Sequence, residues 1–266
     1  MHTAVERHLA ELQASRYAPA TIAARANTLA RIADPLSLTR ESTQDWWATR
    51  QTRADGKPRS VASLSAEASH LRAFARWAIQ EGLIDRNPAD WLPRIRQPST
   101  RPHAMSEGDL HRALSRAEPA MRRALALAAM AGLRSSEIAV VTWADIDRGN
   151  GLLWVREGKG KKDRSVPLSA GLLVELGDPT AGPIIGEKVT GKAISLRIGR
   201  YLRGLGIDST AHRLRARYAT RFLAATGDLV ATAEAMGHAD VSTTARYTVA
   251  SGDTMRRGAE AAGRIG

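Results

Sequence analysis

Apolar residues recur at three- and four-residue spacing in three stretches of the N-terminal part of the chain. This spacing places them on one face of a helix. A further stretch, which carries Trp46 and Trp47, is also predicted to be helical, so the sequence predicts four helices. The predicted helices span residues 2–15, 21–33, 40–53 and 60–82. Pro19 separates the first two, and Gly82 is a predicted helix end. The last helix is the longest, and its apolar face runs from Val61 to Ile79.

Two pairs of side chains on these helices have more than one interpretation. Trp46 and Trp47 fit packing between helices better than stacking on bases, because a large apolar ring is usually buried. Arg72 and Arg76 lie one turn apart, away from the apolar face of the longest helix. They could grip phosphates or form an ordinary solvated face, and the pattern leaves both open.

A basic, proline-rich stretch follows these helices. Prolines recur there among arginines, and proline favours an extended, semi-rigid spacer. The sequence therefore predicts a helical domain at 1–95, a linker at 96–105 and a second domain at 106–266. Arg94 and Arg96 would lie against the phosphate backbone if DNA passed between the two domains.

The second domain opens with two predicted helices, at about 107–117 and 119–131. Ser106 is a predicted N-cap, and Gly132 is a predicted helix end. Arg134 stands between this end and a new helix that begins near Ser135. A junction of this kind directs a side chain out of the core.

The strongest β pattern lies at residues 152–155 and 164–168, which flank a glycine-containing basic tip. The pattern predicts a hairpin. Lys159, Lys161 and Lys162 lie at the tip, which is either a solvated turn, a mobile proton donor or a finger that enters a DNA groove. Any of the three lysines could serve as the donor.

A predicted helix at 190–205 leads to a stretch rich in groups that handle phosphate. His212 and Arg215 are three residues apart, so they share a helix face and can approach one anion. Gly237 is a predicted helix end that would place His238 at a turn. Tyr247 follows nine positions later. A histidine at a helix end is often only a cap, and Tyr247 alone could be a core residue, as Tyr201 and Tyr218 are expected to be.

The distribution of charge indicates that both domains, and not only the second, can bind a phosphate-rich partner. The chain of 266 residues has a net charge of +12, with 14 basic and 10 acidic side chains in residues 1–100 and 25 and 17 in residues 101–266. Both parts are suited to a polyanion, although an arginine-rich proteome would give the same balance. The absence of cysteine excludes disulfides and zinc–thiolate sites. No apolar run is long enough for a membrane span, and we expect a cytoplasmic protein that works in the host cytoplasm or nucleoid.

The ordered motifs AGLR-SSE, GKGKKDR-x-VPL, HRLR and MGH, with a tyrosine nine residues beyond the last histidine, closely resemble those of the tyrosine recombinases, the integrase and Xer family. The resemblance covers nearly the whole chain. It implies a mainly α fold with a small β-hairpin or sheet, in two domains. The N-terminal one would be a helical core-DNA-binding (SAM-like) domain, and the C-terminal one a mixed α/β catalytic domain.

The resemblance also implies roles for individual residues. Tyr247 would attack the scissile phosphate and form a 3′-phosphotyrosine, while Arg134 and Arg215 hold the non-bridging oxygens. His212 would be the general base and Lys159 the general acid.

The same resemblance implies that His238 donates a further hydrogen bond to the phosphate and that Glu137 supports the site without reacting. Because the covalent link conserves the phosphodiester energy, we expect no cofactor and no metal.

The subtype follows from the two ends of the sequence. It starts directly on the core-binding helices, without an arm-binding domain, and its tail lacks the His-Pro-Arg-Ala segment of chromosomal Xer proteins. We therefore expect a phage or mobile-element integrase that acts as a homotetramer on two duplexes with inverted core repeats, with a possible directionality factor. An Xer-like resolution recombinase, a type IB topoisomerase and a non-catalytic DNA-binding regulator are the alternatives. Residues 254–262 form a predicted tail helix that would dock on a neighbouring protomer.

Overall fold

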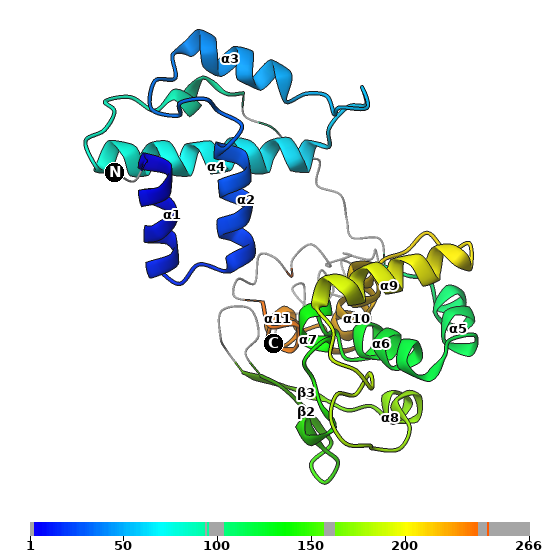
Figure 1. The fold of residues 1–266 in the computed structure, drawn as a ribbon. Helices are drawn as coiled ribbons and strands as arrows, with labels where there is room; N and C mark the ends of the chain where they lie inside the picture. Colours follow the sequence, from blue (N-terminus) through cyan, green and yellow to red (C-terminus); the bar gives the residue numbers. More distant parts are fainter. Residues whose placement is uncertain (1–2, 94, 96–103, 157–162, 239–243, 245–266) are drawn as a thin grey trace, which may run out of the picture. The chain divides into compact units, whose positions relative to one another are not determined.

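The computed structural model describes residues 3–93, 95, 104–156, 163–238 and 244. The chain divides into two compact units, residues 1–99 and 100–266. Helices dominate both units, and one small sheet lies in the second (Figure 1). The prediction of a mainly helical protein with a small sheet is confirmed.

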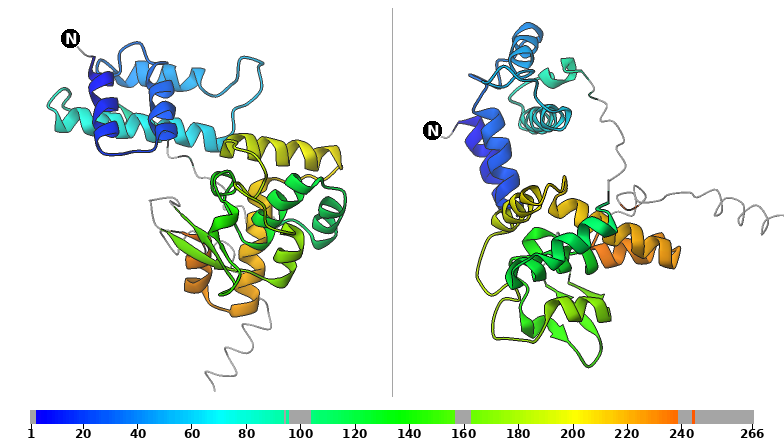
Figure 2. Two further views of the ribbon diagram at one scale, coloured as in Figure 1. Left: turned by 60° about the horizontal axis from the view of Figure 1, so that its bottom comes forward. Right: turned by 90° about the vertical axis from the view of Figure 1, so that its right-hand side faces the viewer.

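The N-terminal unit is built from helices that lie against the longest of them, α4, as two further views also show (Figure 2). Its elements are α1 (Ala4–Ala14), α2 (Pro19–Leu29), α3 (Arg40–Thr49), α4 (Val61–Gln80) and the 3-10 helix η1 (Pro88–Trp91). Leu71 and Phe74 from the middle of α4 are completely buried. Val61 and Ile79 are exposed, contrary to the prediction, because they are the first and second-last residues of the helix. Trp77, which the apolar pattern did not include, is buried instead.

Side chains at the helix starts explain where these helices begin. The Thr3 hydroxyl accepts the N–H of Glu6, and the Glu6 carboxylate accepts the N–H of Thr3, which is a reciprocal cap. Pro19 is the first residue of α2 and not a break before it. Proline suits this position because an N–H there would lack an intrahelical partner in any case.

The paired tryptophans pack inside this unit. Trp46 is buried in the core with Leu71 and Phe74, and Trp47 is partly buried against it. The two ring centroids are 6.0 Å apart. Packing, and not base stacking, is therefore the role of Trp46, as the sequence favoured.

The C-terminal unit surrounds a second core. Its elements are α5 (Glu107–Ser115), α6 (Pro119–Met130), α7 (Ser135–Ile138), the 3-10 helix η2 (Trp143–Asp145), β1 (Ile146–Asp147), β2 (Leu152–Val155), β3 (Arg164–Pro167), α8 (Ala170–Leu176), α9 (Gly191–Gly204), α10 (Ala211–Thr226) and α11 (Leu229–Met236). α6 lies against α8, α9 and α10, and residues 124–129 are all buried within it. Ser106 caps α5 by accepting the N–H of Asp109, as predicted.

Three antiparallel strands form the sheet, in the order β1-β2-β3. Leu153 pairs with Val166, and both are fully buried, whereas Trp154 points to the other face and is 43% exposed. The hairpin of β2 and β3 was predicted; β1 and α8 were not, because two and seven residues are too few to show a period. Among the residues that the structure describes, no helix has both the length and the apolar character needed to cross a membrane.

Candidate active site

A buried carboxylate, that of Glu137, lies at the centre of the candidate site. Glu137 is 4% exposed and belongs to the short helix α7. Its Oε1 accepts one guanidinium N–H of Arg134 at 2.9 Å, and its Oε2 accepts the backbone N–H of the same residue at 2.7 Å. Arg164 donates to both oxygens at 2.9 Å, and Arg215 forms an ion pair at 3.7 Å. Three arginines, from the start of α7, from β3 and from α10, thus converge on one carboxylate.

These arginines keep the carboxylate charged. Burial by itself raises the pKa of Glu137, but the hydrogen bonds and charge of Arg164, the N–H of Arg134 and the charge of Arg215 outweigh it. Together they lower the pKa to about 2. At neutral pH the cluster therefore holds three positive charges and one negative charge, which leaves an excess suited to an anion.

All three arginines also hold the end of α11. Arg164 Nε donates to the carbonyl of Ala235 at 3.1 Å, and Arg134 Nη2 donates to the carbonyl of Gly237 at 2.8 Å. The last carbonyls of a helix lack intrahelical partners and carry partial negative charge, so they favour cations. Each guanidinium is thereby fixed at two ends, by Glu137 and by the helix terminus.

Arg215 is the most enclosed of the three, with a side chain that is 4% exposed. It donates to the carbonyls of Gly132 and Met236. Gly132 has a φ of +65°, and a Cβ there would lie 2.4 Å from the ring of Tyr218. Only glycine fits this junction between α6 and α7, and the fit brings its carbonyl to Arg215.

The turn after α11 positions His238. Gly237 ends the helix in the left-handed conformation, with a φ of +59°, as the sequence predicted. A Cβ at this position would lie 2.8 Å from Nη1 of Arg164. The conformation and the close approach of Arg164 both require glycine.

His238 is half-buried and lies in the field of the cluster. Its Nδ1 is 2.7 Å from the hydroxyl of Thr244. Burial, then the charges of Arg215, Arg134 and the other nearby cations, lower the pKa of His238 to about 4. The ring is therefore neutral at pH 7, with one ring nitrogen bearing a proton that it can donate.

His212 occupies the first turn of α10, one turn before Arg215, and its side chain is exposed. Its charge is the smallest of the named influences that lower the pKa of His238. The helix therefore carries an exposed imidazole one turn before a buried guanidinium. That the two side chains approach one anion together stays a prediction.

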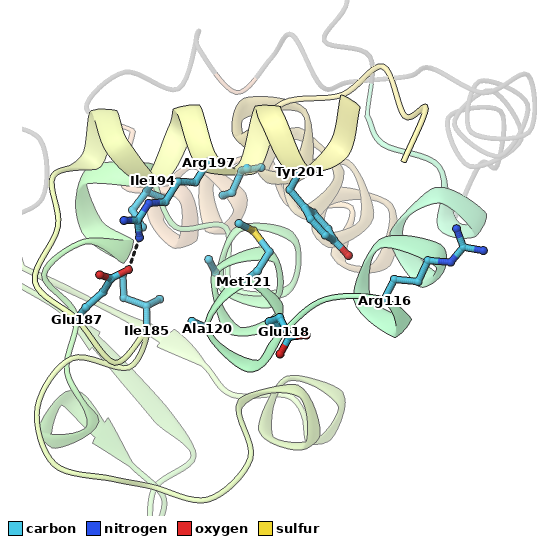
Figure 3. A pocket seen from close by; sticks show the side chains of 11 residues that line it. Arg116, Glu118, Ala120, Met121, Ile185, Glu187, Ile194, Arg197 and Tyr201 are labelled. Carbon is cyan, nitrogen blue, oxygen red and sulfur yellow. Dashed lines mark hydrogen bonds and ion pairs between the residues drawn. The ribbon is translucent and has the colours of Figure 1, made fainter. Parts of the chain in front are cut away.

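Tyr201 and Tyr218, the tyrosines of this unit other than the predicted nucleophile Tyr247, have packing roles. Tyr201 donates its hydroxyl to the carbonyl of Ala113 at 2.7 Å, beside an apolar hollow of about 340 Å³ between α6 and α9 (Figure 3). Tyr218 is buried against Gly132. Burial raises the pKa of both phenols, which disfavours the phenolate that a nucleophile needs.

Comparison with known families identifies the chain. The family model described as "Phage integrase family" matches residues 104–178 and 185–252, which is more than half of the chain. The chain belongs to this family, whose members are tyrosine recombinases. It is therefore a site-specific DNA recombinase, as the motifs predicted.

Relatives of this recombinase include curated Xer proteins. It is 32% identical to tyrosine recombinase XerC of Shewanella amazonensis over 210 residues, which is 71% of this chain and 70% of that protein. It is 31% identical to tyrosine recombinase XerA of Thermococcus kodakarensis over 216 residues, which is 75% of each protein. A solved structure of the Tn1549 transposon integrase in complex with transposon right end DNA covers 99% of this chain and 100% of that chain, with a TM-score of 0.75 and 17% identity. That likeness supports the two-domain recombinase fold.

Several predicted site residues lie outside the described residues of the recombinase. They are Arg94, Arg96, Lys159, Lys161, Lys162 and Tyr247. The structure brings the other predicted catalytic residues and the predicted supporting residue, Glu137, together in the C-terminal unit. These are Arg134, Glu137, His212, Arg215 and His238. The predicted tail helix at 254–262 also lies outside the described residues.

Arg164 is the member of the cluster that the sequence reasoning missed. It stands in the predicted hairpin, within the GKGKKDR-x-VPL motif. Along β3, Arg164 is half-buried, Ser165 is exposed and Val166 is buried, so the arginine shares the inward face with Val166. A charged residue in register with the apolar face of a strand is the signal that could have identified it.

The two arginines predicted on α4 have different surroundings. Arg72 is partly buried and donates to the carbonyl of Leu92 at 3.3 Å. Arg76 is exposed and contacts the carbonyl of Arg72 at 3.4 Å. A DNA contact by either side chain stays a prediction.

Proposed function

We propose that Tyr247 is the nucleophile of this recombinase and that Arg134 and Arg215 hold the non-bridging oxygens of the scissile phosphate. The phenol oxygen attacks phosphorus, a 3′-phosphotyrosine bond forms, and the bond to the 5′-oxygen breaks. The observation that carries the proposal is the fixed arginine cluster around Glu137. Guanidinium groups held in place before the reaction stabilise the negative charge that grows in the transition state.

Two proton transfers complete the cleavage step. His212 accepts the phenol proton of Tyr247, and Lys159 gives a proton to the departing 5′-oxygen. The exposed position of His212 on α10, one turn before Arg215, supports its assignment. Reversal of the two transfers, with a 5′-hydroxyl from another strand, rejoins the DNA. Because the phosphotyrosine retains the bond energy, the cycle requires neither a nucleotide nor a metal.

His238 donates a hydrogen bond to a phosphate oxygen in this proposal. A lowered pKa keeps the ring neutral beside three arginines, so it acts as a donor without adding to their mutual repulsion. Glu137 and Arg164 act as positioning residues, because they orient Arg134 and the end of α11 and do not touch the phosphate.

The substrate in this proposal is double-stranded DNA with inverted core repeats, bound by a homotetramer on two duplexes. The DNA in the Tn1549 integrase complex and the basic charge of both units support the choice of duplex DNA. The N-terminal unit is proposed as the core-DNA-binding domain. We propose an integrase of a phage or mobile element, with a possible directionality factor, because the tail lacks the His-Pro-Arg-Ala segment of chromosomal Xer proteins. The XerC and XerA relatives support the alternative, an Xer-like resolution recombinase.

Trapping the covalent intermediate tests this proposal. The recombinase is expressed in its native host, the cells are quenched with denaturant and chelator, and the DNA that stays attached to protein is sequenced. Adducts at one discrete locus, absent for Tyr247→Phe, are expected, and the locus distinguishes an attachment site from a chromosomal resolution site. Scattered adducts would indicate a topoisomerase, and equal adducts from Tyr247→Phe would exclude Tyr247 as the nucleophile.

A further inference from the structure

The loop between α3 and α4 forms a small exposed hairpin. The N–H of Arg53 donates to the carbonyl of Lys57 at 2.8 Å, and the N–H of Arg59 donates to the carbonyl of Gln51 at 2.9 Å. Gly56, with a φ of +76°, closes the turn. Residues 51–58 are all exposed, and the loop extends beyond the adjoining ends of both helices (Figure 1, Figure 2). We call residues 51–59 the α3–α4 hairpin.

A second buried carboxylate ties both ends of this hairpin to α4. Glu67 is 5% exposed. Arg50, directly before the hairpin, donates to its two oxygens at 2.9 and 3.2 Å. Arg59, the last hairpin residue, donates to the same oxygens at 3.1 and 2.8 Å. Arg31 adds a contact at 3.5 Å. Bidentate pairs of this kind fix direction as well as distance, so the hairpin leaves the helices at a defined angle.

The tip of the hairpin carries two positive charges that face each other. Arg53 and Lys57 are opposite residues of an antiparallel pair, and the side chains of such a pair lie on the same face. Neither side chain makes a hydrogen bond or an ion pair with any described residue. The nearby carboxylate of Asp55 accepts the backbone N–H of Lys57. Like charges placed opposite each other repel, so the arrangement is stabilised by an anion bound to both.

We propose that the α3–α4 hairpin binds the phosphate backbone of duplex DNA through Arg53 and Lys57, and that Glu67 positions it. This inference rests on the proposed function, which supplies DNA as the substrate. A solvated turn would need neither a facing pair of cations nor a buried clamp at its base. The backbone of a duplex offers the repeated negative charges that two such cations can engage together.

Salt dependence of binding tests the inference with the full chain. The affinity for a mixed-sequence duplex about three helical turns long is measured over a series of KCl concentrations. Each lost phosphate contact reduces the slope of log K against log salt by about 0.9. The double variant Arg53→Gln/Lys57→Gln should therefore have a slope shallower by about 1.8 and bind at least about tenfold more weakly at low salt.

A matched control has the same loss of charge elsewhere in the unit. Arg40 and Arg86 are exposed, and their side chains make no hydrogen bond or ion pair with the residues that the structure describes. Arg40→Gln/Arg86→Gln should keep the slope of the unmodified chain. Equal slopes for the hairpin variant and the unmodified chain, or an equal loss in both double variants, would overturn the hairpin assignment. If the unmodified chain itself does not bind the duplex, the proposed function fails as well, so the two failures are distinguishable.

Discussion

Glu67 and Glu137 are buried carboxylates that each lie among three arginines, one in each unit of the chain. Around Glu67, the arginines come from the ends of α2 and α3 and from the α3–α4 hairpin, and the carboxylate is their shared partner. Around Glu137, each arginine has a second bond to a backbone carbonyl. The first arrangement joins elements, whereas the second also fixes the direction of each guanidinium.

The difference shows how one motif serves two purposes. Burying a charge is costly, so both carboxylates need their arginines for the unit to fold. Only the Glu137 cluster adds the carbonyls of α11 and an exposed histidine around the same arginines. A half-buried histidine with a lowered pKa interacts with each cluster, His238 with that of Glu137 and His70 with that of Glu67. A buried ion pair alone therefore does not mark an active site; the second bonds to backbone carbonyls, which fix the direction of each guanidinium, distinguish the Glu137 cluster.

The largest expected effect comes from Arg164, which sharpens the comparison because it forms bidentate bonds to Glu137 and also holds α11. Arg164→Lys keeps the charge but loses the fork, so DNA cleavage in a single turnover should fall about 10- to 100-fold. DNA affinity should change little, since the residue does not touch the phosphate. The rate at saturating recombinase and the dissociation constant, measured on the site found by adduct sequencing, separate the two. An unchanged rate would remove Arg164 from the positioning role.

A smaller effect on the cleavage rate is expected from substitutions of the glycines that end α10 and α11. Gly227 and Gly237 both adopt the left-handed conformation, but a Cβ meets open space at Gly227 and Arg164 at Gly237. Alanine at either position should lower the free energy of unfolding by about 1–2 kcal/mol, measured by urea titration, because of the left-handed backbone. Only Gly237→Ala should also slow cleavage, by about tenfold, through the displaced Arg164. Equal cleavage rates for the two variants would contradict this account.

The smallest effect is a change in protonation at His238. Its pKa in the folded chain is lowered from 6.5 to about 4, so its contribution to stability is full above pH 6.5 and is lost as the pH falls toward 4. Glu137 contributes in a lower pH range. Its contribution to stability is present above its unfolded pKa of 4.5 and is lost as the pH falls through its folded pKa of about 2. NMR titration of the histidine ring protons, assigned with His238→Gln, should give a midpoint near 4 that rises when DNA brings its phosphate to the ring. A midpoint of 6.5 or above in the free chain would show that burial and the arginines do not lower the pKa of this ring.

Helices such as α4 and α9 could be predicted from the sequence because their apolar residues recur over many positions. β1 and α8 were not, since short elements form through contacts that are distant in sequence. Candidate site residues could be predicted where they belong to ordered motifs, as His212 and Arg215 do. The shared role of Arg164 was not, because it depends on α11, which lies 71 residues further along the chain at Ala235. No local pattern encodes that contact.

The hairpin at α3–α4 illustrates the same limit. The sequence predicted a third helix that extends to residue 53, whereas α3 ends at Thr49. Glu67 draws Arg50 and Arg59 together, and this long-range clamp ends the helix early and folds the following residues into a hairpin. Tertiary contacts outweighed the local preference.

The most direct test of the central claim compares Glu137→Gln with Glu67→Gln in one assay, with circular dichroism to verify that both variants fold. Each substitution removes one buried negative charge from three arginines. We expect Glu137→Gln to slow single-turnover cleavage about a hundredfold at saturating recombinase, since its arginines lose their orientation at the phosphate. Glu67→Gln should weaken DNA binding and leave that rate within about twofold. Equal cleavage rates for the two folded variants would contradict the claim that the Glu137 cluster is the one that handles the phosphate.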